Sequence, residues 1–139
     1  MQEISTFIAN HLLLTYAFSG VLVLLMIVEF LRQKRQAFVI STTRAVQLIN
    51  HDNAAVIDIR VADSYAKGHI IDAQSIPAAE LIANTKKYEK LKLRPVIIVC
   101  NTGAESQKTA ALLLKQGYNV YSLAGGLRAW SAADMPLVP

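Results

Sequence analysis

The residue in this sequence best placed to do chemistry is its single cysteine, Cys100. It ends the apolar segment PVIIVC, and the loop NTGAE separates it from Ser106, which we expect to cap the next helix. In such a strand–loop–helix turn, eased here by Gly103, backbone N–H groups and the positive end of the helix dipole form an anion site. A thiolate held there has a lowered pKa and is a nucleophile. The alternative reading is a buried structural cysteine at a strand end.

Strand-like and helix-like segments alternate from Ser41 to Pro139, which is the pattern of an α/β domain. Short apolar runs predict strands at residues 54–59, 73–76, 95–100 and 119–123. Helical segments are predicted at 42–50, 63–66, 78–83, 86–91, 106–116 and around Trp130. These short spacings predict a small parallel β-sheet with helices on both faces. Ligands of such sheets bind beyond the carboxyl ends of the strands, and Cys100 lies at that end of the most hydrophobic strand.

The N-terminal segment, residues 1–31, contains an uncharged apolar run from Leu12 to Val28. Extended through Leu31 it reaches about 20 residues, or roughly 30 Å as a helix, which is enough to cross a bilayer core. We therefore predict one transmembrane helix at about 11–31, a basic linker at 32–40 and the α/β domain at 41–139. A cleaved signal peptide is the alternative, but no Lys or Arg precedes the run and no A-x-A cleavage pattern follows it.

The basic residues are distributed asymmetrically. All 14 lysines and arginines follow the apolar run, and Arg32, Lys34 and Arg35 stand directly behind it. By the positive-inside rule, this predicts a single-pass protein of the cell inner membrane with its C-terminal domain in the cytoplasm. A single free thiol also suits a reducing compartment, and a basic domain is attracted to anionic membrane lipid.

The sequence does not favour two other classes of site. The densest basic cluster, from Lys86 to Arg94, lacks the interleaved aromatic residues that stack on bases, so it predicts a solvated helix face and not a nucleic-acid site. One cysteine and three widely spaced histidines, His11, His51 and His69, form no set of metal ligands. We therefore expect neither a metal nor another cofactor.

The chain from about Ser41 to Pro139 resembles a single-domain rhodanese, of the thiosulfate-type sulfurtransferase family. Four stretches carry the resemblance. They are VIDIR at 56–60, an aspartate–x–arginine strand end; YAKGHIIDAQSIP at 65–77, with a glycine–histidine–isoleucine signature; CNTGAES at 100–106, the active-site loop; and VYSLAGGLRAW at 120–130, a double-glycine and tryptophan motif. An N-terminal membrane anchor on such a domain is a known architecture in the family.

The resemblance implies a rhodanese-like fold and a sulfurtransferase in which Cys100 takes sulfane sulfur from a small donor as a persulfide. Backbone amides of the loop would hold the anionic donor; the residues are Asn101, Thr102, Gly103, Ala104, Glu105 and Ser106. Asp58 and Arg60 would support the loop, and His69 and Trp130 would be structural. Because the chain has no second cysteine, the acceptor must be external: a small thiol, cyanide or a cysteine of a partner protein.

Two residues depart from the family pattern. Many loops of the family carry a basic residue where this chain has Glu105, whose carboxylate would repel a dianionic donor such as thiosulfate. Glu105 could instead point to solvent and interact favourably with the N-terminal end of the helix dipole. Asp72 stands where glycine is usual, and we expect it to change only the turn.

The same residues suggest two alternative functions. A non-enzymatic, membrane-anchored interaction module would retain the fold and use its anchor and basic face to bind partners. A cysteine phosphatase would need an arginine six positions after the cysteine to bind phosphate, and Ser106 occupies that position. The interaction module therefore stays as the alternative, and the phosphatase is excluded.

Overall fold

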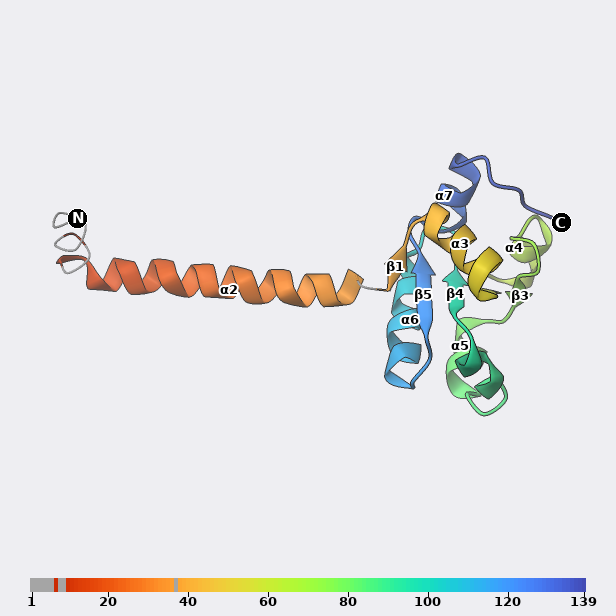
Figure 1. The fold of residues 1–139 in the computed structure, drawn as a ribbon, viewed down its shortest axis with the longest axis horizontal. Helices are drawn as coiled ribbons and strands as arrows, with labels where there is room; N and C mark the ends of the chain where they lie inside the picture. The colour runs from red at the N-terminus through yellow and green to blue at the C-terminus, as the bar shows by residue number, and fades with distance from the viewer. Residues whose placement is uncertain (1–6, 8–9, 37) are drawn as a thin grey trace. The chain divides into compact units, whose positions relative to one another are not determined.

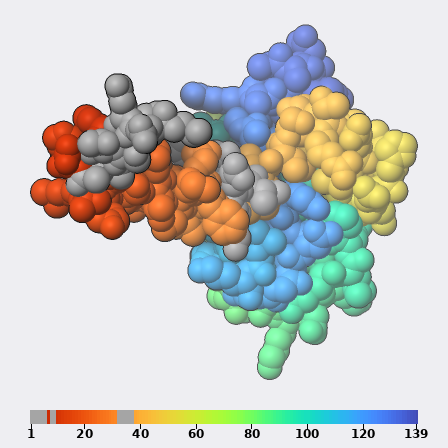
Figure 2. Space-filling model, turned by 60° about the vertical axis from the view of Figure 1, so that its left-hand side comes forward, coloured from red at the N-terminus to blue at the C-terminus, as the bar shows by residue number. Residues whose placement is uncertain are grey.

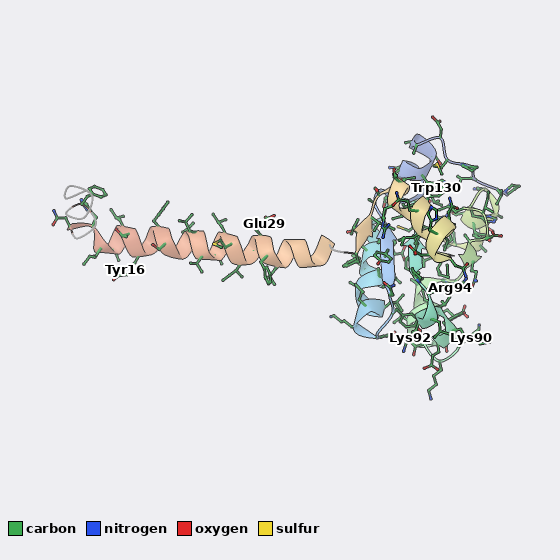
Figure 3. All side chains as sticks on the ribbon, viewed as in Figure 1. Tyr16, Glu29, Lys90, Lys92, Arg94 and Trp130 are labelled. Atoms are coloured by element: carbon green, nitrogen blue, oxygen red, sulfur yellow. The ribbon has the colours of Figure 1, made fainter. Side chains whose placement is uncertain are left out.

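The computed structural model describes residues 7, 10–36 and 38–139, and the chain divides into two compact units, Met1–Ala37 and Phe38–Pro139. In the first unit, helix α2 spans Leu12–Gln36. Its strongly apolar segment Leu12–Leu31 is 20 residues long and contains no buried residue, and side chains project from both sides of the helix in the view of Figure 3. By length and composition α2 can cross a membrane, and a signal sequence meets the same criteria.

Two elements occupy most of residues 32–40, the segment predicted as a linker. Helix α2 continues to Gln36, and strand β1 spans Val39–Ile40. The strand pairs in parallel with strand β5 (Val120–Leu123), placing Ile40 opposite Leu123. A two-residue strand has too few side chains to show an alternating pattern, so sequence periodicity missed it.

The second unit is built on a five-stranded parallel sheet with the strand order β1-β5-β4-β2-β3 (Figure 1). After β1, the strands are β2 (Ala55–Asp58), β3 (Gln74–Ser75), β4 (Val96–Val99) and β5 (Val120–Leu123). Each of these four lies within a segment that the sequence predicts as a strand. The middle strand, β4, pairs with β2 and β5 and is entirely buried. Burial on both faces explains why it reads as a continuous apolar run.

Six helices belong to the domain. They are α3 (Thr42–Asp52), α4 (Ala62–Ala66), α5 (Ala78–Ala83), the 3-10 helix η1 (Glu89–Leu93), α6 (Ala104–Lys115) and α7 (Gly126–Ala132). Segments α3 and α6 both reach the surface of the face drawn in Figure 2. The segment predicted as helical at 86–91 differs, because residues 86–88 form a turn before η1. η1 ends at Leu93, and the next residue, Arg94, is extended, as the residue before a proline prefers to be.

Two hydrophobic cores lie on opposite faces of the sheet, because successive strand residues point to opposite sides. Val96 and Ile98 of β4 join one core, whereas Ile97 and Val99 join the other. Side chains of α5, η1 and α6 complete the first core, and those of α3 and α7 complete the second. Helices therefore cover both faces, which confirms the predicted α/β architecture.

Candidate active site

Cys100 directly follows β4 at the carboxyl end of the sheet, and only 4% of the residue is exposed. Helix α6 begins soon afterwards at Ala104, so the loop between them turns back sharply. The turn depends on Gly103, whose φ of +91° lies in the left-handed region. A Cβ atom at this position would lie 3.1 Å from the backbone nitrogen of Gly125, so a larger residue would require the neighbouring backbone to shift.

The Sγ atom of Cys100 is surrounded by hydrogen-bonding groups of the loop and of α6. The backbone N–H of Gly103 donates to it at 3.1 Å and that of Ser106 at 3.5 Å, and the thiol donates to the Ser106 hydroxyl at 3.4 Å. Burial raises the pKa of the Cys100 thiol. Hydrogen bonding with the Ser106 hydroxyl, together with hydrogen bonds from the backbone N–H groups of Ser106, Gly103 and Thr102, outweighs burial, so the pKa lies below its ordinary value. The site therefore favours the reactive thiolate.

Ser106 does not cap the helix, and that prediction was wrong, because α6 already begins at Ala104 after the left-handed turn at Gly103. Its fully buried hydroxyl donates to the carbonyl oxygen of Gly103 at 3.1 Å and shares a 2.9 Å hydrogen bond with the Ser122 hydroxyl of β5. Ser122 is also fully buried, and it was not identified from the sequence. The feature of the sequence that could have identified Ser122 is a small hydroxyl residue within a core strand, because a buried polar group needs a hydrogen-bond partner.

The start of helix α7 packs against the backbone of the cysteine loop. The N–H of Leu127 donates to the carbonyl oxygen of Cys100 at 2.9 Å, and the N–H of Arg128 donates to that of Asn101 at 3.1 Å. Gly126 makes this approach possible. Its φ is +59°, and a Cβ atom there would collide with the carbonyl oxygen of Cys100 and lie 2.7 Å from the carbonyl carbon of Asn101. The double glycine therefore positions the loop, a role that was not inferred from the sequence.

Asp58 and Arg60, predicted as supports, form an ion pair at the end of β2. The Nε of Arg60 donates to both carboxylate oxygens of Asp58 at 3.0 Å, and Nη2 donates to Oδ2 at 2.7 Å. Nη2 also donates to the carbonyl oxygen of Gly68 at 2.6 Å. The pair thus ties β2 to the turn at Gly68. Within the described part of the chain, no side-chain hydrogen bond of either residue reaches the cysteine loop.

The other predicted loop residues have exposed side chains; they are Asn101, Thr102, Ala104 and Glu105. Glu105 stands in the first turn of α6, and its charge is not among the causes of the lowered pKa of Cys100. Among residues 7, 10–36 and 38–139, no group of three or more His, Cys, Asp or Glu side chains is placed to hold a metal.

The signature turn that contains His69 is a structural feature of the domain. The His69 ring stacks on Tyr65 with 3.7 Å between ring centroids, and its backbone pairs with Val138 near the C-terminus. Asp72 adopts a φ of +61°, which is the left-handed conformation that glycine adopts at no steric cost. This turn therefore holds the C-terminal tail against the domain.

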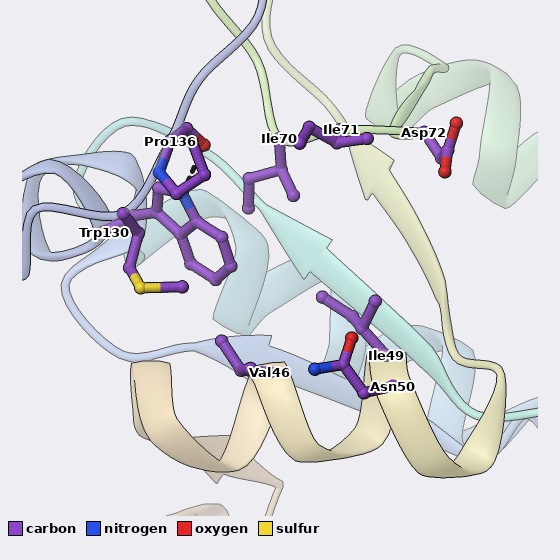
Figure 4. Close-up of a pocket in the computed structure, with 9 residues that line it drawn as sticks. Val46, Ile49, Asn50, Ile70, Ile71, Asp72, Trp130 and Pro136 are labelled. Atoms are coloured by element: carbon purple, nitrogen blue, oxygen red, sulfur yellow. Dashed lines mark hydrogen bonds between the residues drawn. The ribbon is translucent and has the colours of Figure 1, made fainter.

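Several cavities open on the domain surface, and two of them bear on the candidate site. One, of about 430 Å³, is lined by residues around α4 and α7 and by Asn101 of the cysteine loop. The other, of about 300 Å³, is mainly apolar, with Val46, Ile70 and Trp130 in its wall (Figure 4). Trp130 is buried, and its Nε1–H donates to the carbonyl oxygen of Pro136 at 3.0 Å. This second cavity shares no lining residue with the cysteine loop, so it is a separate feature.

Comparison with known proteins identifies the type of domain. The family profile described as "Rhodanese-like domain" matches residues 41–133, which include all four sequence stretches noted above. The YibN protein of Escherichia coli K12, which is named as uncharacterized, is 35% identical over 140 residues and aligns over 99% of this chain and 98% of its own length.

Enzymes and solved structures are also among the similar proteins. The thiosulfate sulfurtransferase GlpE of Pseudoalteromonas translucida is 37% identical over 99 residues, which cover 68% of this chain and 89% of GlpE. The crystal structure of a rhodanese-related protein from Thermoplasma volcanium matches with a TM-score of 0.62 at 24% identity, covering 71% of this chain and 95% of that one. The last similarity concerns the fold alone.

Proposed function

Because this chain belongs to the family of rhodanese-like domains, we propose that it is a sulfurtransferase that carries sulfane sulfur as a persulfide on Cys100. The observation that carries the proposal is the setting of the Sγ atom, which accepts hydrogen bonds from the N–H groups of Gly103 and Ser106 and has a lowered pKa. Similarity to the thiosulfate sulfurtransferase GlpE supports the same class of reaction.

In the first step, the Cys100 thiolate attacks the sulfane sulfur of a donor such as thiosulfate. A new S–S bond forms to Sγ, the S–S bond of the donor breaks, and its electron pair leaves with sulfite. The persulfide carries the negative charge on its outer sulfur. Backbone N–H groups of the loop at 101–106 would stabilise that charge, because they are fixed in place before the reaction.

In the second step, an external acceptor removes the outer sulfur. A thiolate or cyanide attacks that sulfur, the S–S bond to Sγ breaks, and its electron pair returns to Cys100 as the thiolate. The product is the persulfide of the acceptor, or thiocyanate. Since Cys100 is the only cysteine of the chain, no thiol of the same chain can take the sulfur. A small thiol or a cysteine of a partner protein fits this role.

The proposal includes the site of action in the cell. Helix α2 would anchor the protein in the inner membrane as a single span, because Leu12–Leu31 is apolar, unburied and long enough. The basic residues Arg32, Lys34 and Arg35, which follow this apolar segment within α2, support a cytoplasmic position of the domain. The domain would then exchange sulfur with donors and acceptors close to the lipid surface.

Steady-state formation of thiocyanate from thiosulfate and cyanide tests this function, with the full-length protein in detergent. The wild-type protein should turn over, and Cys100→Ser should lose the activity completely while keeping its melting temperature. If the wild type forms no thiocyanate with thiosulfate or with a persulfide donor, the enzymatic proposal is wrong. The non-enzymatic interaction module would then be the remaining account.

A further inference from the structure

The cavity of about 430 Å³ next to the cysteine loop is lined by positive charge, and we refer to it as the cationic pocket. Its wall includes Arg60 after β2, Lys67 after α4 and Arg128 of α7, together with Asn101 of the cysteine loop. No aspartate or glutamate is among the residues that line it. The pocket therefore presents three cations to whatever occupies it.

Two of these three charges are uncompensated. Asp58 neutralises Arg60 through the ion pair described above. Lys67 and Arg128 have exposed side chains, and neither makes a side-chain hydrogen bond or ion pair with any residue that the structure describes. Arg60 itself uses only Nε and Nη2 for its side-chain bonds there, which leaves Nη1 as a further donor. This arrangement suits an anion and would not suit a neutral or cationic ligand.

The cationic pocket adjoins the loop that carries the nucleophile. Asn101, which lines it, is the residue after Cys100, and consecutive Cα atoms are about 3.8 Å apart. Leu127 and Arg128 also line the pocket, and their N–H groups donate to the carbonyl oxygens of Cys100 and Asn101. The pocket and the cysteine loop are thus held together by direct backbone hydrogen bonds. One molecule could place its sulfur at Cys100 and another of its groups in the pocket.

We propose that the cationic pocket binds the carboxylate end of a small thiol that serves as the sulfur acceptor. The proposal rests on the proposed function, because it names the acceptor of the same cysteine. The guanidinium of Arg128 and the ammonium of Lys67 are the groups that pair with carboxylates. Transfer then proceeds as above: the acceptor thiolate attacks the outer sulfur, the bond to Sγ breaks, and the electron pair returns to Cys100.

The size of the pocket favours the acceptor over a donor such as thiosulfate. Thiosulfate is a sulfane sulfur attached directly to a sulfonate, so it extends little beyond the sulfur that Cys100 attacks. A volume of about 430 Å³ is within the range of sites for small organic ligands. The cationic pocket would hold the carboxylate end of a longer thiol, in which the carboxylate lies several bonds from the sulfur.

Exchange of Cys100 with two aromatic disulfides tests the pocket without requiring sulfur transfer. One probe, 5,5′-dithiobis(2-nitrobenzoate), carries carboxylates, and the other, 4,4′-dithiodipyridine, is neutral. The measured quantity is the rate with the carboxylate probe divided by the rate with the neutral probe. In the full-length protein at low salt, Lys67→Gln and Arg128→Gln should each reduce this ratio several-fold. Lys90→Gln is the control, because it removes one exposed charge from η1, which precedes β4 and lies far from Trp130 of α7 (Figure 3).

The outcomes separate the pocket from the proposed function. If all three variants keep the wild-type ratio, or if Lys90→Gln lowers it equally, the pocket does not recognise carboxylates and the inference is wrong. In steady-state transfer, the KM for mercaptosuccinate should rise several-fold in Lys67→Gln and Arg128→Gln while that for 2-mercaptoethanol stays constant. A ratio that falls in a protein unable to form a persulfide would overturn the proposed function and leave a carboxylate site.

Discussion

At the scale of single residues, burial and hydrogen bonding act in opposite directions on the Cys100 thiol. Burial alone would keep it protonated and inert. The hydroxyl of Ser106 and the backbone N–H groups of Thr102, Gly103 and Ser106 reverse this effect, and the hydroxyl is the largest of these favourable contributions. The lowered pKa of Cys100 therefore depends on Ser106, a residue of α6, as well as on the loop backbone.

Ser106→Ala should raise the pKa of Cys100, because burial remains while the largest of the contributions that lower this pKa is lost. The pH profile of alkylation by iodoacetamide should shift to higher pH, and the rate at neutral pH should fall several-fold. Ser122→Ala is the matched control, since it removes the other hydroxyl of the same buried pair. Equal shifts in both variants would show that packing of the serine pair, not the bond to sulfur, sets the pKa.

Glu105→Gln should raise the rate with thiosulfate, and Glu105→Lys should raise it further, because each change reduces the repulsion of a dianion. A donor with one negative charge should respond less. The gain should shrink as salt rises, since the side chain is exposed. Kinetics of the three proteins with both kinds of donor measure this effect. Equal thiosulfate rates in all three would mean that Glu105 serves only the helix dipole.

The candidate residues that could be predicted from the sequence are those whose setting is local. Cys100 ends an apolar run and Gly103 follows three positions later, so a strand and a tight turn were both apparent. The partners that complete the site come from other segments. Ser122 lies on the neighbouring strand β5 and Arg128 on α7, and only the parallel sheet brings them to the cysteine loop.

At the scale of elements, the site depends on the contact between α7 and the cysteine loop. The first N–H groups of a helix have no partners within the helix. In α7, the N–H groups of Leu127 and Arg128 donate to the carbonyl oxygens of Cys100 and Asn101. α7 therefore contacts the loop from one face of the sheet, whereas α6, the helix that follows the loop, packs on the other face. The contact between α7 and the loop requires a residue without a side chain at position 126.

Gly126→Ala should destabilise the domain by about 3 kcal/mol or more, because the added Cβ collides with the carbonyl oxygen of Cys100. Gly117→Ala is the matched control. Gly117 also has a positive φ, of +86°, but a Cβ there meets nothing within 4 Å, so it should cost only about 1 kcal/mol. Denaturant unfolding of both variants measures the difference. Similar losses would show that backbone conformation matters and that the close approach of α7 does not.

Element boundaries were predictable where an apolar pattern was long enough to read. The core strands and α3 were found within a few residues, because their burial produces clear apolar runs. The start of α6 was misplaced at Ser106, because a left-handed glycine ended the turn earlier than a side-chain cap would. Strand β1 was missed because its pairing with β5 joins residues far apart in the chain.

At the scale of the whole molecule, the prediction of one membrane span with a cytoplasmic domain can be tested by protease accessibility. Protease added to intact cells should spare the domain, while protease added to inverted inner-membrane vesicles should remove it. The physical reason is the cluster Arg32, Lys34 and Arg35, which follows the apolar segment Leu12–Leu31. Digestion from the outside of cells would show the opposite orientation. Release of a shortened, soluble protein would instead show that the helix is a cleaved signal sequence.

The most direct measurement is the intact mass of the full-length protein after treatment with thiosulfate or a persulfide donor. The wild-type mass should increase by one sulfur atom, and a reductant should reverse the gain. Cys100→Ser should show no increase with either donor, because it has no thiolate to form the new S–S bond. The same gain in Cys100→Ser, or no gain in the wild type with any donor, would contradict a sulfurtransferase that works through a Cys100 persulfide.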